Sequence, residues 1–462
     1  MALLQVTVTE KSARPSGNLK PIASPFTSRY DSTSSVIPSH STISPGFCSF
    51  AKEAGPCHLP PGWSTYTHPE GKVYFVCQTS LRIVTEVQLY DPDVQEKIQY
   101  WIAIFNDRLT ASAVQLPEST ELFLELDDAA ESCLYYLVDY NTRVEFWIEK
   151  VSAEDLNLPP AASDSHMRLA LEEHYWVHID RFPCHRCEEV KLMRDELISI
   201  FIHARADHMT SAFSTFPYTA TQCAEFIDLL NSVQCCIVSA YSVSIIARLW
   251  AFVSHNRFAT HYGQEHARLS RDQSILREPV INETWWFRLA SRLMFRLPDG
   301  DLQKLNDLNV DNLVYVEPWK QSMRTYQADW KLTSFWTFAL LIMDVLLLLQ
   351  PSVTRPVVLA SVLCCNTALV SAIVLLTRHH GAEDFHASDA ANYLTEVKRE
   401  TSGYQWTALA FSLPRALFFW ALGAFSFQGV LWLMDATNIY VVGILLAGFM
   451  TMGMDGCLET RP

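Results

Sequence analysis

Four long runs with almost no charged residues lie in the C-terminal part of the chain and constrain its fold most strongly. They cover residues 332–354, 356–377, 416–434 and 436–454. A helix needs about 20 apolar residues to cross the hydrocarbon core of a bilayer, and each run is of that order. The sequence therefore predicts a C-terminal bundle of four transmembrane helices at 332–454.

Basic residues near the ends of these runs predict the orientation of the chain in a membrane. They lie before the first run and between the second and third runs, namely Lys320, Arg324, Lys331, Arg378, Lys398 and Arg399. Cytosolic loops carry the excess of Lys and Arg in membrane proteins. We therefore expect a multi-pass integral membrane protein, in contact with membrane lipid, whose N-terminal region and C-terminus are cytosolic. The sequence leaves the organelle open.

The composition argues against several function classes. The 462 residues carry a formal net charge of −15, whereas nucleic-acid binding requires clustered Lys and Arg. The twelve cysteines lack the spacing of a disulfide framework and suit a reducing compartment. The sequence contains no Gly-rich phosphate loop and no hydrolase or metalloprotease motif. We therefore predict neither enzymatic activity nor a cofactor.

The chain before the bundle divides into three predicted regions. Residues 1–57 are rich in Ser, Pro and Thr, and such a composition buries too little apolar surface to fold, so we expect a disordered tail. Residues 58–160 predict short strands around one amphipathic helix at 92–113. Residues 161–330 predict a mainly helical cytosolic domain.

The stretch LPPGWSTYTHPEGKVYFV, residues 59–76, resembles the start of a WW domain, a three-stranded sheet that binds proline-rich peptides. The resemblance implies that Trp63 and Phe75 form the buried buckle of a small antiparallel sheet. Pro92 or Pro60 would close that buckle.

The peptide groove of this first unit lacks one wall. The resemblance makes Tyr74 one wall of the groove, against which a proline ring of a preformed polyproline II ligand would lie. Gln78 and Thr85 stand where the family has a His and the second Trp. The first unit is therefore expected to be structural.

The missing aromatic residues reappear further along the chain. The stretch YYLVDYNTRVEFW, residues 135–147, resembles the second hairpin of a WW domain, with Tyr136, Tyr140 and Trp147 in the places of the groove Tyr, the His and the second Trp. The resemblance implies a candidate site for a Pro-rich peptide or protein at these three residues together with Tyr74. Alternatively, Tyr136 and Trp147 pack under the preceding helix, in the core of one fused β domain.

The order of these features extends the resemblance to most of the chain after residue 57. A WW-like start, a second aromatic hairpin, a helical middle containing NRFATHYGQEHARLSRDQSI and apolar C-terminal runs resemble uncharacterised WW-domain-containing membrane proteins of basidiomycete fungi. The resemblance implies no particular activity.

Two clusters contain residue types that bind metals. CHRC, residues 184–187, has the spacing of half a zinc site, with His174 and His178 upstream, but no second CxxC completes it. RHHGAEDFH, residues 378–386, offers His and carboxylate side chains, as many solvated loops do. We expect no bound metal at either cluster.

Two further segments each have two interpretations. Residues 284–297 place Trp and Leu on one helical face beside three arginines, which suits a helix in the membrane interface or one packed on its own domain. Asp344 lies in the middle of the first span, where an ionised side chain is costly. It either hydrogen-bonds a partner such as Asn366 or Gln428 inside the bundle, or takes part in proton or ion passage.

These features together predict a mixed α/β membrane protein. It consists of a small antiparallel β domain, a helical domain and a four-helix membrane bundle. The leading functional hypothesis is a membrane-anchored interaction or scaffold protein that uses the WW-like aromatic strands. The alternative is a small channel or transporter built on the four spans.

Overall fold

The computed structural model describes residues 17–30, 59–112, 114–127, 131–185, 190–211, 213–233, 239–276, 281–351 and 353–436. The chain divides into two compact units, residues 1–270 (unit 1) and 271–462 (unit 2). The predicted domain boundaries at 160 and 330 are wrong. The helices after residue 160 share a core with the sheet, whereas those just after residue 281 share a core with the long C-terminal helices.

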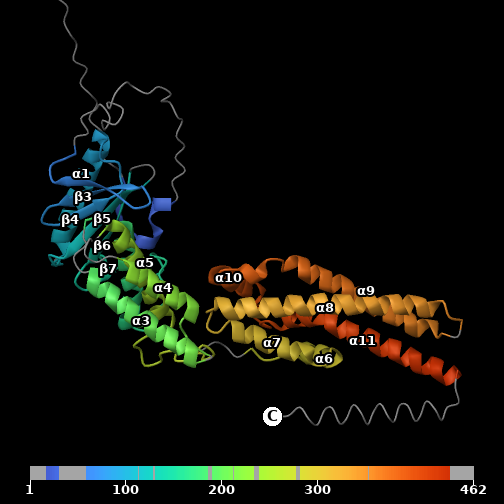
Figure 1. Ribbon diagram of the computed structural model, residues 1–462. Coiled ribbons are helices and arrows are strands. Elements are labelled where there is room, and N and C mark those ends of the chain that lie inside the picture. Colours follow the sequence, from blue (N-terminus) through green and yellow to red (C-terminus); the bar gives the residue numbers. More distant parts are fainter. Residues whose placement is uncertain are drawn as a thin grey trace, which may run out of the picture. The chain divides into compact units, whose positions relative to one another are not determined.

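The strands among the described residues of unit 1 form one mixed sheet of seven, in the order β1-β6-β5-β4-β3-β2 with β7 beside β6 (Figure 1). The strands are β1 (Leu19–Pro21), β2 (Trp63–Thr67), β3 (Val73–Gln78), β4 (Arg82–Thr85), β5 (Thr120–Leu126), β6 (Cys133–Asp139) and β7 (Val144–Phe146). Strands β2 to β4 form one antiparallel meander and β5 to β7 a second. The two meanders join through the parallel pair β4 and β5. The strands predicted within 58–160 are therefore present, but together with β1 they form one mixed sheet and not a small antiparallel one.

Helix α1 (Pro92–Ser112) makes the crossover between the parallel strands β4 and β5 and covers one face of the sheet. It begins where the Asp91 carboxylate accepts the backbone N–H of Asp93 at 3.0 Å, as an N-cap residue does. Its buried residues Ile98, Trp101 and Phe105 lie on one side, at helical spacing. The amphipathic helix predicted at 92–113 is confirmed for residues 92–112, and residue 113 lies outside the described residues.

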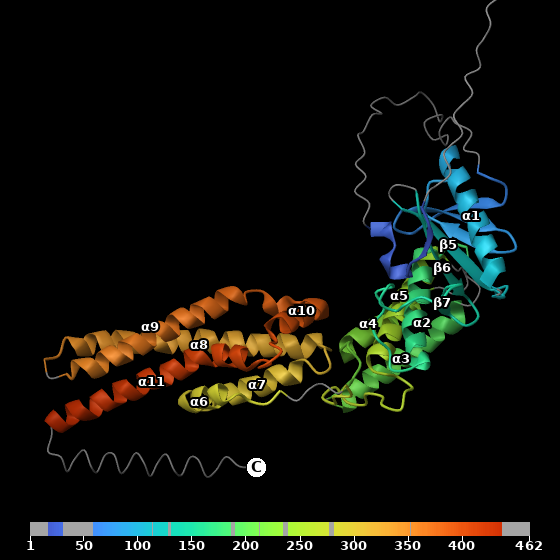
Figure 2. The ribbon, with the colours of Figure 1, turned by 180° about the vertical axis from the view of Figure 1, so that it is seen from behind.

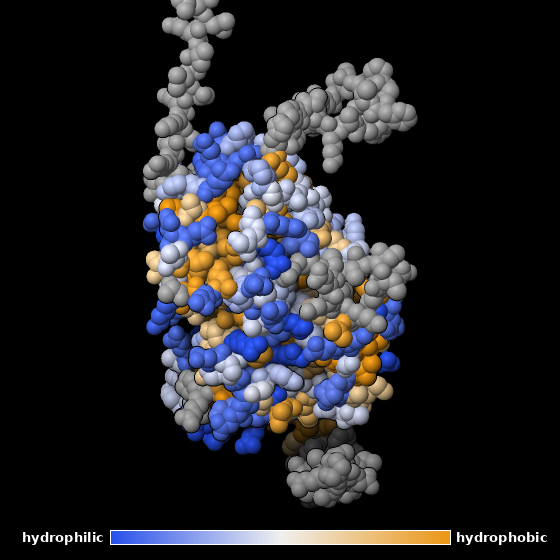
Figure 3. All heavy atoms as spheres, turned by 90° about the vertical axis from the view of Figure 1, so that its left-hand side faces the viewer, coloured by the Kyte–Doolittle hydropathy of each residue, from blue (hydrophilic) through white to orange (hydrophobic). Residues whose placement is uncertain are grey.

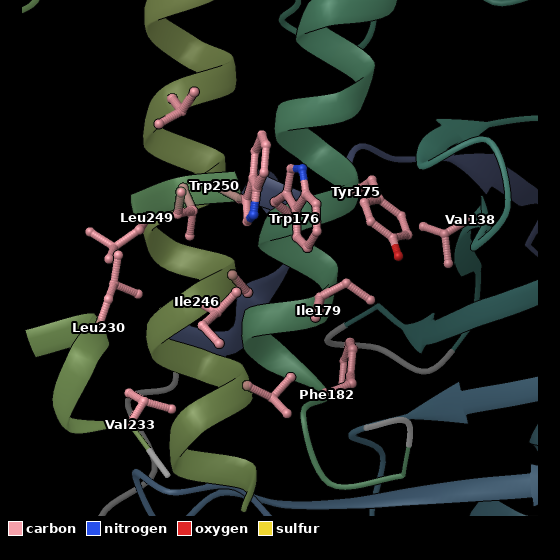
Figure 4. Close-up of a cluster of buried hydrophobic side chains, with 14 of the residues drawn as sticks. Val138, Tyr175, Trp176, Ile179, Phe182, Leu230, Val233, Ile246, Leu249 and Trp250 are labelled. Atoms are coloured by element: carbon pink, nitrogen blue, oxygen red, sulfur yellow. The ribbon is translucent and has the colours of Figure 1, made fainter. Parts of the chain in front are cut away.

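Helix α2 (Asp164–Arg181) packs on the other face of the sheet. Helices α3 (Val190–Thr210), α4 (Ala220–Ser232) and α5 (Ala240–Ala259) lie behind it and complete the same apolar cluster. Trp176 of α2 and Trp250 of α5 stack with their ring centroids 5.4 Å apart, between the two helices (Figure 4). Tyr175 points from α2 toward Val138 of β6 in the same view. Both faces of the sheet are therefore covered by the chain itself.

The predicted disordered tail is wrong for residues 17–30. Leu19 of β1 pairs in parallel with Cys133 of β6 and is buried. The backbone N–H groups of Ser24 and Ser28 donate to the buried carboxylates of Glu145 and Glu125, both at distances near 3 Å. Composition did not indicate that residues 17–30 pack on the sheet, because hydrogen bonds to buried acids help to hold this segment there and composition reports only apolar surface. The rest of the predicted tail lies outside the described residues.

The described residues of unit 2 include three helices long and apolar enough to cross a membrane: α8 (Val316–Leu348), α9 (Arg355–Arg378) and α11 (Gln405–Ala436). They pack side by side in both views of the ribbon (Figures 1 and 2). These helices, called the bundle below, confirm the first three predicted spans as apolar helices. The fourth predicted span lies outside the described residues from 437 onward.

Shorter helices surround one end of the bundle: α6 (Trp285–Leu293), α7 (Leu297–Leu308) and α10 (Ala387–Val397). Thr284, before α6, bonds Gln405 at the start of α11, and the carbonyl of Leu293 accepts the Trp420 indole N–H at 2.9 Å. Helix α6 therefore runs along the first half of α11, in the same direction. Helix α6 packs on its own unit through the buried Phe287, whereas the predicted apolar face stays exposed, with Trp285 at 60%, Leu289 at 47% and Leu293 at 56%. The interpretation of that Trp and Leu face as a membrane-interface surface therefore stays a prediction.

Candidate functional site

Two of the four residues predicted to bind a peptide are fully buried. Tyr74 and Tyr136 lie on the sheet face that α2 covers, each with an exposed fraction of 0%. The Tyr74 hydroxyl accepts the backbone N–H of Cys184 at 2.9 Å, and the Tyr136 hydroxyl lies 3.0 Å from Nδ1 of His178. The prediction that they form an exposed groove is wrong, because helices beyond the WW-like stretch occupy that face.

The other two residues, Tyr140 and Trp147, are half-buried and pack against the core of unit 1. The Tyr140 ring packs edge-on against Tyr175 of α2, and the guanidinium of Arg82 lies 5.6 Å from its centroid. Trp147 donates its indole N–H to the Ile22 carbonyl at 3.0 Å and packs against three apolar clusters of unit 1. The alternative interpretation, one fused β domain with these rings as packing, agrees with these contacts.

The predicted buckle is present in part. Trp63 and Phe75 belong to the same apolar cluster on the face of the sheet that α1 covers. Pro92 lies exposed in the first turn of α1 and does not close that cluster. Thr85, in the place of the missing second Trp, is fully buried, and its hydroxyl accepts the backbone N–H of Val87.

A buried polar network lies where the aromatic groove was predicted. Both oxygens of Glu121 are bound, Oε1 to His178 Nε2 at 3.0 Å and Oε2 to His185 Nε2 at 2.9 Å. Burial raises the pKa of Glu121, but the charge of His185 and hydrogen bonds from both histidines outweigh it and hold that pKa well below its usual range. The carboxylate is therefore ionised inside the core.

The same network fixes the protonation of its neighbours. Burial lowers the pKa of His178, so its ring is neutral, with Nε2–H donating to Glu121 and Nδ1 accepting the hydroxyl proton of Tyr136. Burial also raises the pKa of Tyr136 far above its usual value. The chain from Tyr136 through His178 to Glu121 links β5 and β6 to α2.

A second buried acid lies nearby, also on the side of α2. Glu145 of β7 accepts the backbone N–H of Ser24 and is fully buried, which raises its pKa to about 8. His174 of α2 lies 3.9 Å from this carboxyl, and burial lowers its pKa to about 4. Both groups are therefore neutral near pH 7. The sequence did not indicate these buried acids, because a Glu in a strand next to apolar residues normally points to solvent.

Asp344 is fully buried within the bundle. Its Oδ2 lies 2.6 Å from Ser361 Oγ, which also lies 3.0 Å from the Ala421 carbonyl oxygen. The Ser361 hydroxyl donates to Asp344 and also faces the Ala421 carbonyl, and the Cys365 thiol approaches the same carboxylate oxygen at 3.8 Å. Asp344 and Ser361 thus connect α8, α9 and α11 at one level.

The predicted partners of Asp344 are not those observed. Asn366 is exposed and donates to the Val362 carbonyl of its own helix. Gln428 is buried, but neither of its amide atoms has a hydrogen-bond partner among the described residues. Serine in the facing helix was the missed partner, as is common where helices approach closely in membranes.

The described residues contain no group of three metal-ligating side chains close enough to hold a metal ion. Of the CHRC segment, Cys184 donates its thiol to the Thr67 carbonyl. In the loop after α9, His379 bonds the Tyr393 hydroxyl at 2.8 Å, and Glu383 accepts from Gln327. Each of these groups therefore has a structural partner.

Comparison of the chain with protein-family models, with curated proteins and with solved structures finds no match. The resemblance to WW-domain-containing membrane proteins of fungi stays a prediction.

Proposed function

We propose that this protein is a membrane-anchored interaction protein whose unit 1 binds an extended peptide along β2. The observation that carries the proposal is the free edge of the sheet. Strand β2 ends the strand order, and no other described strand pairs with its outer side, where only the Thr67 carbonyl at its end is known to accept a bond, from the Cys184 thiol. An unpaired edge offers its backbone groups to a partner strand, a common mode of peptide recognition.

The hydrogen-bond pattern of β2 identifies the groups available to a partner. Bonds from Gln78 to Gly62 and from His68 to Lys72 flank the strand on its inner side. In an antiparallel pair the bonding positions alternate, so Thr65 directs both its N–H and its C=O outward. Thr65 is therefore the position where an added strand would form a pair of backbone bonds.

The surroundings of Thr65 suit a partner of mixed polarity. Its hydroxyl lies 3.0 Å from that of Tyr90, and the Tyr90 side chain is itself exposed. Separately from Thr65, a band of apolar side chains crosses the mainly hydrophilic face that Figure 3 draws. The three long apolar helices of unit 2 support the anchoring part of the proposal.

A substitution at Thr65 tests the proposed edge. Thr65→Pro removes the outward N–H and blocks an added strand, while Thr65→Ala keeps the whole backbone. With the full chain in lipid nanodiscs and an array of extended peptides, we expect Thr65→Pro to weaken binding about ten-fold or more, in line with the loss of backbone bonds of roughly 1 kcal/mol each.

Two results would contradict the proposal. Equal binding by the two variants places the peptide elsewhere than the β2 edge. An absence of binding across a broad array, with wild-type protein whose thermal unfolding is normal, removes the interaction function itself.

Asp344 supports a second candidate, proton or ion passage through the bundle. Its fully buried carboxyl and the amide of Gln428, which has no partner among the described residues, place polar groups inside the bundle. In reconstituted vesicles, this candidate requires wild-type proton or cation flux above that of empty vesicles, and its loss in Asp344→Asn. Wild-type flux equal to that of empty vesicles leaves Asp344 as a hydrogen bond between helices.

A further inference from the structure

A cavity of about 350 Å³ lies between the end of α9, helix α10 and the start of α11. Its apolar part is formed by Leu375, Ala410 and Phe411. Two arginines and one acid line its polar part: Arg378 at the end of α9, Arg399 in the turn after α10, and Glu396 of α10. The cavity therefore joins an apolar surface of the bundle to two positive charges and one negative charge.

The two guanidinium groups are available to a ligand. Both arginines are exposed, and neither lies within salt-bridge distance of a carboxylate among the described residues. Arg399 packs over the ring of Trp406, whose centroid is 5.5 Å away. Trp406 also lines the cavity and is 55% exposed. Unpaired arginines beside an exposed Trp favour an anionic ligand with an apolar part.

The cavity lies at the polar end of the bundle. Arg378 ends the uncharged run of α9, and the neighbouring turn inside the run exposes Ile373 and Val374, at 50% and 54%. On α11, Phe411 comes one turn before Arg415, after which the uncharged run begins. The arginines are thus at the depth where a lipid headgroup meets its acyl chains.

We propose that this cavity binds the phosphate of an anionic phospholipid. Arg378 and Arg399 donate to the phosphate oxygens, and the acyl chains continue over Ile373 and Val374. Guanidinium groups bind phosphate through paired charge-assisted hydrogen bonds, and basic pockets between spans at the cytosolic face hold anionic headgroups. The proposal adds a specific lipid site to the anchoring function and rests on the bundle being in a membrane.

Binding of lipid to the full chain tests the site. Wild-type protein is reconstituted in phosphatidylcholine nanodiscs with increasing phosphatidylglycerol, and bound lipid is measured by native mass spectrometry. We expect saturable binding of phosphatidylglycerol that is weakened about ten-fold or more in the double variant Arg378→Gln/Arg399→Gln. The matched control, Lys320→Gln/Arg324→Gln on α8, removes the same charge outside the cavity and is expected to bind as wild type does.

Three outcomes overturn the site. Equal weakening in both double variants shows a general effect of charge, and unchanged binding in the cavity variant shows that the lipid binds elsewhere. Inorganic phosphate or glycerol 3-phosphate that competes at concentrations similar to the lipid assigns the cavity to a soluble anion. Loss of β2-edge peptide binding leaves this site unaffected, so the two proposals fail separately.

Discussion

The single residue Trp147 was predicted to line a peptide groove, but it packs in the core of unit 1. Its indole hydrogen-bonds Ile22 and packs against three apolar clusters. We expect Trp147→Ala to lower the free energy of unfolding of unit 1 by about 3 kcal/mol, at the low end for a large aromatic residue because the ring is half-buried. Trp147→Phe should cost about 1 kcal/mol through loss of the hydrogen bond.

Chemical denaturation of the full chain in detergent, followed by circular dichroism, measures both changes. The opposite pattern, normal stability of Trp147→Ala with loss of peptide binding, would restore the groove interpretation for this residue.

Glu145 makes the stability of unit 1 depend on pH. Its pKa is about 8 in the folded protein and near 4.5 when exposed, so between these values the folded state holds a proton that the unfolded state has lost. Stability therefore falls as pH rises through this window, by at most about 1.4 kcal/mol per pH unit. His174 acts in the opposite sense between its folded pKa of about 4 and its exposed value of 6.5.

The two effects oppose each other between pH 4.5 and 6.5. Above pH 6.5, Glu145 acts in the same direction as His255, whose pKa is raised by its hydrogen bond with Glu173. We expect the unfolding temperature of wild type to fall between pH 6.5 and 8, and that of Glu145→Gln to fall less steeply. A parallel decline in both proteins would assign the pH dependence to other groups.

Single residues of the candidate site were the least predictable from the sequence. The alternation in ELFLEL directs Glu121 to solvent when only one face of a strand is covered. Here helices cover both faces, so Glu121 lies in the core beside His178 and His185. Such long-range coverage has no local signal, and neither does the burial of Tyr74 and Tyr136.

Single helices and strands were more predictable from the sequence than the strands with which they pair. The helix at 92–113 and the three apolar helices follow from periodicity and length, because each pattern is satisfied within one segment. The arrangement of β4 beside β5 depends on the crossover by α1, and β1 pairs with a strand more than a hundred residues away. Pairing over such separations cannot be inferred from local pattern alone.

Gln405 determines where helix α6 begins. Its side-chain oxygen accepts the N–H and hydroxyl of Thr284, its amide donates to the Asn282 carbonyl, and it is only 3% exposed. Gln405→Ala leaves these groups without partners, and we expect a cost of about 1–3 kcal/mol to local stability. Hydrogen exchange over residues 282–293 should accelerate accordingly.

The exposed Gln321 of α8 makes no side-chain hydrogen bond with a described residue, so Gln321→Ala is the matched control. Unchanged exchange at 282–293 in Gln405→Ala would show that α6 is held by its packing on α11 instead.

At the scale of the whole molecule, composition predicted a cytosolic part and a membrane part of the chain. It misplaced the boundary between unit 1 and unit 2. The apolar clusters of unit 1 contain residues only up to Phe258, and those of unit 2 begin at Phe287. The helical middle of the chain therefore belongs to two cores. Helical periodicity reports that a face is apolar without indicating which partner covers it.

Separate cores predict that unit 1 folds without the bundle. With a specific protease site inserted between Ser270 and Arg271, cleavage should release residues 1–270 as a soluble fragment with an unchanged unfolding midpoint, while the remainder sediments with membranes. A site between Trp250 and Ala251 is the control, because cutting α5 divides a buried core and should leave the fragment unfolded. Precipitation of the 1–270 fragment would show that unit 1 needs unit 2 to fold.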